Sequence, residues 1–458
     1  MKTNTFNVLK YGAINDGKTL STVAVQKCID EASNQNGIIY FPQGEYVLST
    51  LYLRNNTSIF FAKDVKILGS LNFYDFERDE KVDYPLYQDE SHSFFHSSLF
   101  VAEHVNNIKV YGNATIDMRS VWDEDNVRHI VHRGCKAFAL KECKKILITD
   151  INVLNVTDLG IYFAGCEKVT IRNVSMRVYI DGISPDNSKK VLIENCDIEA
   201  GDDAIVLKSS YTLNRIDECN DITIRNCRLK SRCNAIKFGT ESNGGFKNIK
   251  IHGIQIYDTR ITGISLETVD GAIVDNVSIR NINMTNVGTP LFVHIGKRLR
   301  GPEGISIGSI SNVSFENITA KGPYKLYNCI AWNYVSYLAQ SNLQFPGVFS
   351  KDIKPEVGTW QITSNICGLP DYPIKNISFK NIDFELDGGV QEYSEDVTEE
   401  PCIYPEVNAY GKILPASGLF FRHIDGLSFK HVNIKLLHKD ARPKIVLRDV
   451  IMKQDINE

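Results

Sequence analysis

The sequence predicts an all-β fold, a single-stranded parallel β-helix in which successive coils of the chain stack on one another. The first indication is a recurring phrase of two polar residues and an apolar/polar alternation, with copies NNIKV, KKILI, EKVTI, KKVLI, NDITI, KNIKI, DNVSI, SNVSF, KNISF and DGLSF. The second is the spacing between the first apolar residues of these copies, which begins 38, 23, 22, 31, 27, 28 and 36 residues. A period in the low twenties, padded by insertions and rich in period-2 strands, is typical of stacked coils. One coil cannot bury its own apolar face, so neighbouring coils must cover one another.

A short amphipathic helix is expected to cap the open N-terminal end of this stack. Residues 6–20 form a strand and a Gly/Asp turn, and residues 21–33, STVAVQKCIDEAS, follow. Ser21 or Thr22 can serve as the N-cap, and Gly37 closes the helix. Terminal repeats of a solenoid need such a cap. The apolar positions at helical spacing are Val25, Cys28, Ile29 and Ala32.

One domain is expected to span residues 1–458, because coil stacking lets a chain with 43% hydrophobic residues bury a long core. The repeat is interrupted near residues 71–103, 296–304 and 321–371. Long loops on a rigid scaffold often carry binding residues, as is expected of the first insertion, and the other two insertions are expected to form the walls of a cleft. Packing of the loops against the coils is the alternative. The last insertion contains the aromatic residues Trp332, Tyr334, Tyr337, Phe345 and Trp360.

The charge balance argues against two classes of partner. The net charge is −4 and the pI is about 6.2, so the chain has no basic footprint for nucleic acid or an anionic membrane surface. The opening MKTNTFNVLKYGA has no apolar signal region, and no run of 18 apolar residues occurs. A cytoplasmic protein is therefore expected, although a secreted or periplasmic protein that had been trimmed would look the same.

The eleven cysteines are predicted to be reduced thiols in the core. Their number is odd, and no CxxC or Cys/His cluster has metal-ligand spacing. Many lie beside the repeat phrases, where a small buried hydrophobic side chain fits a coil corner. No metal and no cofactor are expected.

Three carboxylates within about one repeat carry the chemistry of the chain. Asp181 lies twelve residues after Val169, and Asp203 lies twelve after Val191. Residues at one coil position on adjacent coils lie about 4.8 Å apart. The same offset predicts a column of Asp158, Asp181, Asp203 and Asn234, with Asp202 beside it.

Stacking carboxylates on one another is unfavourable in free energy, because neighbouring like charges repel and do not ionise independently. Solvated turn residues are the alternative interpretation of these Asp residues. Glycoside hydrolysis needs one carboxylic acid to protonate the leaving oxygen and another carboxylate to act on water or the sugar. Mutual repulsion within a crowded set raises one pKa and leaves the others ionised, which gives this division. Gly201 can provide the bend that lets Asp202 and Asp203 face one cleft.

The chain resembles glycoside hydrolase family 28, the polygalacturonases and rhamnogalacturonases, over most of its length. The resemblance rests on NVLKYGAINDGKTL, FPQGEYVLSTLYL, ILGS and DGISPDNSKKVLIENCDIEAGDDAIVLKS. The family motif Asn-Thr-Asp-Gly keeps only Asp181 and Gly182, whereas Gly-Asp-Asp matches in full at residues 201–203. The resemblance implies a right-handed β-helix and an inverting hydrolase. Asp202 would be the general acid, and Asp181 and Asp203 would bind and activate water.

Two departures from the family pattern bear on the substrate. Cys233-Asn234-Ala235 stands where the family has Gly-His-Gly, so Asn234 replaces the His that assists the acid. Ser265-Leu266-Glu267 stands where the family has the Arg-Ile-Lys that grips a galacturonate carboxylate. A negative Glu267 would repel a uronate and could accept hydrogen bonds from sugar hydroxyls. The substrate-binding candidates are Asn234, Lys237, Glu241, Glu267, His294 and Arg298. For Lys237, Glu241, His294 and Arg298, a surface position is the alternative.

Three functions are compatible with these residues. The first is an inverting glycoside hydrolase, exo-acting on an oligosaccharide or glycoside that is pectin-derived or a related plant glycan. The second is a Ca²⁺-dependent polysaccharide lyase or epimerase, because fold alone does not decide function. The third is a non-catalytic carbohydrate-binding solenoid. A carbohydrate is the expected partner in each case, and the sequence leaves open whether the chain forms a homo-oligomer.

Overall fold

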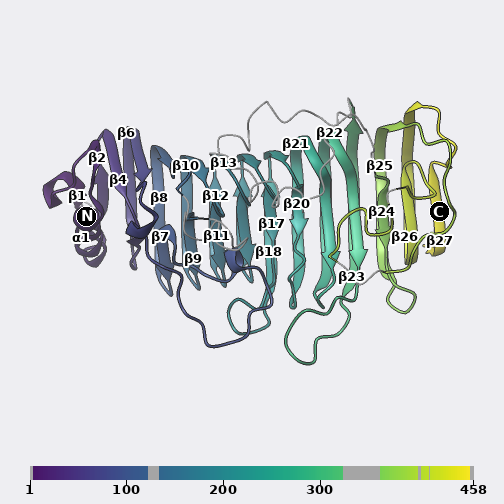
Figure 1. Ribbon diagram of the computed structural model, residues 1–458, viewed down its shortest axis with the longest axis horizontal. Coiled ribbons are helices and arrows are strands. Elements are labelled where there is room, and N and C mark those ends of the chain that lie inside the picture. Colours follow the sequence, from purple (N-terminus) through teal and green to yellow (C-terminus); the bar gives the residue numbers. More distant parts are fainter. Residues whose placement is uncertain (1–3, 122–133, 323–361, 401–403, 412, 454–458) are drawn as a thin grey trace. The chain divides into compact units, whose positions relative to one another are not determined.

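The computed structural model describes residues 4–121, 134–322, 362–400, 404–411 and 413–453 (Figure 1). These residues form two compact units. The first comprises residues 4–121, 134–202 and 212–214, and the second comprises the rest. Both are built from parallel strands, and the prediction of one domain over residues 1–458 stays a prediction.

The first unit begins with the capping helix and continues as stacked strands; three short 3₁₀ helices are labelled η. Its elements are β1 (Thr5–Asn7), η1 (Val8–Tyr11), β2 (Asp16–Leu20), α1 (Thr22–Asn34), β3 (Ile38–Phe41), β4 (Gly44–Leu48), β5 (Leu51–Tyr52), β6 (Ser58–Gly69), η2 (Phe73–Asp75), η3 (Glu90–His92), β7 (Ser98–Glu103), β8 (Asn106–Asp117), β9 (Lys136–Lys141), β10 (Lys144–Val156), β11 (Ile161–Ala164), β12 (Glu167–Arg172), β13 (Ser175–Val178), β14 (Ile183–Asp186), β15 (Lys189–Glu194) and β16 (Asp197–Ala200).

The strands of the first unit form parallel ladders along the stack. One ladder joins β6, β8, β10, β12 and β15. A second joins β10, β13 and β16, and a third joins β5, β7, β9, β11 and β14. Each coil therefore contributes a strand to several ladders, which is the arrangement of a parallel β-helix.

The second unit continues with longer strands. Its elements are β17 (Ile205–Leu207), β18 (Glu218–Arg225), β19 (Arg228–Ser231), β20 (Asn234–Phe238), β21 (Gly245–Thr268), β22 (Ile273–Ile295), β23 (Ser309–Lys321), β24 (Ser364–Cys367), β25 (Ile374–Gly388), β26 (Leu419–His438) and β27 (Ile445–Met452). One parallel ladder joins β18, β21, β22, β23, β25 and β26. Another joins β17, β20, β21, β22, β24 and β26.

The register predicted from the repeat phrases is confirmed within each unit. Val169 pairs with Ile146 on one side and with Val191 on the other. In the second unit the first apolar residue of each phrase likewise pairs with that of the next, from Ile222 to Leu427. These residues form the apolar core between coils and are at most 3% exposed.

The second polar residue of every phrase has a positive φ angle. Asn is tolerated in this left-handed region better than other residues with a side chain, and Gly adopts it freely. The φ angles lie between 51° and 88°, which turns the chain sharply into the next strand. The polar pair is thus the corner of the coil, and its second residues are Asn107, Lys145, Lys168, Lys190, Asp221, Asn248, Asn276, Asn312, Asn376 and Gly426.

The N-terminal helix is confirmed as α1, which is the one α-helix among the described residues. Figure 1 shows it at the purple end of the first unit, next to β1 and β2. Ser21 is its N-cap residue, and the four apolar side chains expected at helical spacing are fully buried. Gly37 donates its N–H to the Ala32 carbonyl (2.8 Å), but Asn36 is the residue that takes the left-handed conformation. This helix is not long and apolar enough to cross a membrane, and no other described helix is.

The structure describes the first two insertions, part of the third, and nine of the eleven cysteines. Residues 71–103 hold η2 and η3 before β7 restores the coil, and residues 296–304 are irregular. Most of the third insertion, residues 323–361 with its five aromatic residues, lies outside the described residues. Nine cysteines are described, and all nine are buried free thiols, as predicted.

Candidate active site

The first unit supplies Asp181 and Asp202. Asp181 lies in the short connection between β13 and β14 and is 5% exposed. Asp202 follows β16 at a bend that includes Gly201, where the sequence predicts one, and its side chain is half-buried. The backbone N–H of Asp202 donates to the Ile180 carbonyl (3.2 Å), which fixes the bend beside the Asp181 connection. Asp202 is therefore the more accessible of the two carboxylates.

A histidine from the first insertion reaches Asp181. His92 is the last residue of η3, and its Nε2 lies 3.4 Å from Asp181 Oδ2. The other ring nitrogen, Nδ1, lies 2.9 Å from an oxygen of Asp89, the residue that caps η3. The ring is 3% exposed and packs edge-on against Tyr162. Sequence reasoning did not identify His92, although Asp three residues before His within a 3₁₀ turn is a local signal of such a pair.

Asp158 lies in a buried ion pair and not in the solvated turn that was the alternative interpretation. It is 4% exposed, so it is not a solvated turn residue. Its Oδ2 lies 3.1 Å from the ammonium of Lys136, which is also buried. Burial lowers the pKa of Lys136, but the attraction of Asp158 raises it by more. The net result is a pKa above the ordinary value for lysine. Asp158 and Lys136 form an ion pair inside the first unit, which suits a structural role.

The second unit begins at Asp203, whose carboxylate is held by Asn234. Asn234 donates both its backbone N–H (3.1 Å) and its side-chain Nδ2 (2.8 Å) to Asp203 Oδ1. Both residues are at least 95% buried, and Asn234 is the first residue of β20. The predicted adjacency of Asp203 and Asn234 is confirmed. Two N–H donors on one oxygen stabilise the ionised form of a carboxylate.

Lys237 lies between two carboxylates. Its Nζ is 3.9 Å from Asp203 Oδ2 and 4.0 Å from Glu267 Oε1. The ladder pairs Lys237 with Ser265, which places this lysine opposite the position where the family Arg is absent. Burial lowers the pKa of Lys237, but Glu267, Tyr404 and Asp203 raise it well above its ordinary value.

Glu267 is the most enclosed of the predicted site carboxylates, with 1% exposure. Ser265 donates its hydroxyl to Oε1, while Oε2 makes no hydrogen bond to any residue that the structure describes. Burial raises the pKa of Glu267 to about 7, although Lys237 and Ser265 act in the opposite direction. Glu267 is therefore poised to donate or accept a hydrogen bond near neutral pH.

The remaining predicted cations and acids form pairs around an exposed tyrosine. Lys208 and Glu241 form a buried ion pair of 2.6 Å, and Arg298 binds Asp270 through two nitrogens. The Arg298 guanidinium also lies 5.6 Å from the centre of the Tyr404 ring. Lys237 Nζ lies 5.5 Å from the same ring, which is 36% exposed. Sequence reasoning missed Lys208 although it lies in the family-like stretch that ends in AIVLKS, and it missed Asp270 and Tyr404, which belong to no repeat phrase or family motif.

His294 pairs with Glu267 in the ladder between β21 and β22. Its ring is 1% exposed, stacks on Phe292 and hydrogen-bonds through Nδ1 to the Tyr410 hydroxyl (2.7 Å). Burial, with Arg422 nearby, lowers the pKa of His294 to about 3, so the ring is neutral. Its predicted contact with a substrate stays a prediction, because Phe292 and Tyr410 enclose the ring.

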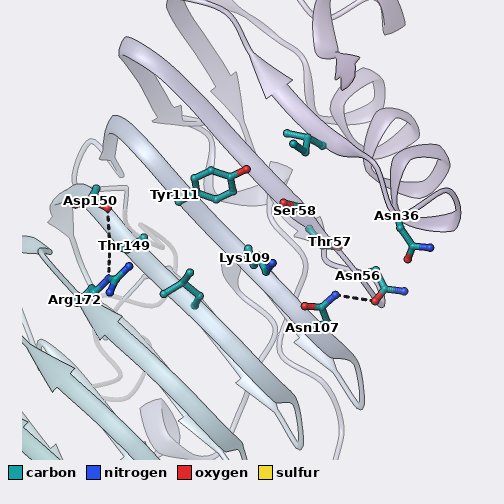
Figure 2. A pocket seen from close by; sticks show the side chains of 12 residues that line it. Asn36, Asn56, Thr57, Ser58, Asn107, Lys109, Tyr111, Thr149, Asp150 and Arg172 are labelled. Atoms are coloured by element: carbon teal, nitrogen blue, oxygen red, sulfur yellow. Dashed lines mark hydrogen bonds between the residues drawn. The ribbon is translucent and has the colours of Figure 1, made fainter. Parts of the chain in front are cut away.

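A shallow depression on the first unit, of about 530 Å³, contains none of these residues. Figure 2 shows its mainly polar lining along neighbouring strands. Asn107 donates to Asn56 (2.9 Å), and Arg172 donates to Thr149 (3.4 Å). These contacts belong to the corners and the outer face of the coils.

A sequence model of one family matches this chain. The family is described as rhamnogalacturonase A/epimerase, pectate lyase-like, and the match covers residues 5–257. A probable polygalacturonase from Vitis vinifera is 23% identical over 296 residues, which are 61% of this chain and 60% of that relative. An exopolygalacturonase from Zea mays is 23% identical over 351 residues, which are 69% of this chain and 76% of that relative.

The fold also resembles solved structures. A hyperthermoactive exopolygalacturonase from Thermotoga maritima superposes with a TM-score of 0.65 and 18% identity over 94% of this chain and 92% of that one. At this identity the likeness shows the fold alone. The family match spans more than half of the 458 residues. The chain therefore belongs to the rhamnogalacturonase A/epimerase, pectate lyase-like family, and it is a divergent relative of glycoside hydrolase family 28.

Proposed function

We propose that the protein is an inverting, exo-acting glycoside hydrolase with a right-handed parallel β-helix. Asp202 is the general acid, and Asp181 and Asp203 bind and activate the water. The substrate is an oligosaccharide or glycoside, pectin-derived or from a related plant glycan. The name of the Zea mays relative supports exo action, and the cytoplasmic location stays a proposal.

The observation that carries this proposal is the difference between the two consecutive acids. Asp203 is 5% exposed and receives two N–H donors, which favour the ionised form that a base acting on water requires. Asp202 is half-buried at a bend, where a leaving-group oxygen can approach it. Neighbouring residues with separate environments supply the acid and the base that an inverting hydrolase needs.

The charges around Asp203 favour a neutral sugar over a uronate in the bound position. Lys237 lies beside Asp203 and Glu267, Lys208 is paired with Glu241, and Arg298 with Asp270. Each cation is thus already matched by a carboxylate of this protein. The exposed Tyr404 ring offers a flat apolar surface of the kind that sugar sites use.

A Ca²⁺-dependent lyase or epimerase is the second candidate, because the family description includes both chemistries. It would use acidic residues of this chain to hold the ion. The two candidates differ in product, since a lyase leaves an unsaturated sugar and a hydrolase does not. A non-catalytic carbohydrate-binding solenoid is the third.

Product release from galacturonides, rhamnogalacturonan fragments and neutral glycosides tests these candidates, with and without a chelator. The proposal expects chelator-resistant release of a saturated sugar, strongest on neutral glycosides. Ca²⁺-dependent release of an unsaturated product would establish the lyase. Binding of a glycan without any product would favour the binding solenoid.

A further inference from the structure

Within the first insertion, Asp89 and His92 form a rigid unit. The Asp89 carboxylate caps η3 by accepting the His92 backbone N–H (3.1 Å), and both of its oxygens lie within 3.0 Å of His92 Nδ1. The same carboxylate therefore fixes the start of the 3₁₀ turn and the orientation of the imidazole ring.

The coils hold this unit from the other side. Tyr162, in β11, donates its hydroxyl to the His92 carbonyl (2.7 Å), and its ring meets the imidazole edge-on at 5.3 Å. Tyr162 itself lies in a buried cluster with Phe95 and Ile180. Ile180 directly precedes Asp181, so the packing that anchors the histidine also anchors the chain that carries the acid.

The second ring nitrogen faces Asp181. His92 Nε2 lies 3.4 Å from Asp181 Oδ2, inside a region where both residues are at least 95% buried. Nε2 makes no hydrogen bond to any residue in the described part of the chain. The Asp89 carboxylate, which can only accept, faces Nδ1, so the tautomer with its proton on Nδ1 would direct the Nε2 lone pair at the Asp181 carboxylate. One proton between Nε2 and Asp181 removes that repulsion and gives a charge-assisted hydrogen bond.

We propose that His92 is a positioning residue for the hydrolysis proposed above, holding Asp181 by a hydrogen bond donated from Nε2 while Asp89 holds Nδ1. The inference rests on that proposed function. It gives a function to the first insertion, which places His92 beside Asp181. Asn234, which occupies the position of the family His, is engaged with Asp203 instead. Catalytic hydrogen bonds are often long in the free enzyme and shorten when substrate binds.

Two substitutions of His92 separate its two contacts. In His92→Asn the amide lies near the place of Nδ1, so it can still reach Asp89 but not Asp181. In His92→Gln the amide lies near the place of Nε2, so it can still donate to Asp181. We expect His92→Asn to lower kcat by about 10- to 100-fold with KM within about twofold, because misplacing a reacting group costs factors of this size. His92→Gln should recover most of the rate.

Two controls keep the test specific. Asp89→Asn preserves a good N-cap for η3 while removing the carboxylate, so it should lower kcat without unfolding the loop. His96→Asn removes another histidine of the same insertion, one that pairs with Glu103 (3.7 Å), and should leave kcat unchanged. Equal kcat for wild type and His92→Asn, on a substrate that the wild type cleaves, would overturn the proposal. If His92→Asn lowers kcat and His92→Gln does not recover it, the lost contact with Asp181 is not the cause of the lower rate.

A second readout does not depend on activity. In a protein labelled with ¹⁵N-histidine, the His92 signals are those absent from His92→Asn. We expect Nε2 to carry a proton whose resonance moves in Asp181→Asn. If no substrate is cleaved but this signal is found, the hydrolase proposal fails and the His92–Asp181 contact stands. A bare Nε2 that does not respond to Asp181→Asn overturns the contact, whatever the activity.

Discussion

Replacing Glu267 by Gln should make the protein less sensitive to rising pH. Burial raises the pKa of Glu267 from 4.5 to about 7, so the folded state holds this proton more tightly than the unfolded state. The group therefore contributes stability that is complete below pH 4.5 and is lost as the pH rises through 7. Glu267→Gln keeps a neutral side chain at every pH and lacks this loss.

The magnitude follows from the interval between the two pKa values. A shift of about 2.5 pH units, at about 1.4 kcal/mol per unit, corresponds to about 3 kcal/mol. Unfolding entropy is about 2.1 cal/mol/K per residue, or about 1 kcal/mol/K for 458 residues. A change of about 3 kcal/mol thus moves Tm by about 3 °C if the whole chain unfolds together.

Thermal unfolding of both proteins at pH 5 and pH 8 measures this difference. The Tm of the wild type should fall by about 3 °C more than that of Glu267→Gln. Other titrating groups shift both proteins equally and cancel in the comparison. Glu303→Gln, at an exposed carboxylate, serves as the matched control and should follow the wild type. Parallel curves for wild type and Glu267→Gln would refute the raised pKa of Glu267.

Three more predictions concern the buried charges and the site. Lys136→Met leaves the Asp158 carboxylate without its cation and should destabilise the protein by about 3–5 kcal/mol in urea unfolding; Lys136→Met with Asp158→Asn should recover most of this, and no recovery would contradict the ion pair. Asn234→Ala removes one of two donors to Asp203, worth about 1.5–3 kcal/mol, so kcat should fall about 10- to 100-fold; unchanged kcat would show that Asp203 needs no such support. Excess EDTA should leave the rate of sugar release unchanged, since the proposed mechanism uses no metal; loss of activity that Ca²⁺ restores would favour the lyase.

The register of the coils could be predicted because it repeats. Each phrase places a corner residue before an apolar residue, and Lys168, Asp221 and Asn248 all adopt the left-handed conformation there. The conformation is set by the next few residues, so a local pattern is enough to identify it. The adjacency of Asp203 and Asn234 follows from the same offset of twelve residues and is confirmed by two hydrogen bonds.

The surroundings of the acids could not be predicted in the same way. His92 reaches Asp181 from a loop 89 positions earlier in the chain, and the loop has no periodic signal. Tyr404 approaches Lys237 from a segment that is just as irregular. Such contacts depend on how a loop closes over the coils, and loop closure is decided by packing that no repeat encodes. Lys237 could be predicted as a site residue because it follows Asn234 closely in the sequence, but the sequence did not predict its pairing with Glu267.

Product release by wild type and Asp202→Asn on the glycoside panel, with NMR detection of the anomer first formed, tests the proposed roles of the three acids. Wild type should release a saturated sugar with inverted configuration in the presence of chelator. Asp202→Asn should lose that activity by at least about 100-fold while keeping its fold, because general acid catalysis contributes about 10²–10⁴-fold. Release by Asp202→Asn at the wild-type rate, or retention of configuration, would contradict the proposed roles of the acids.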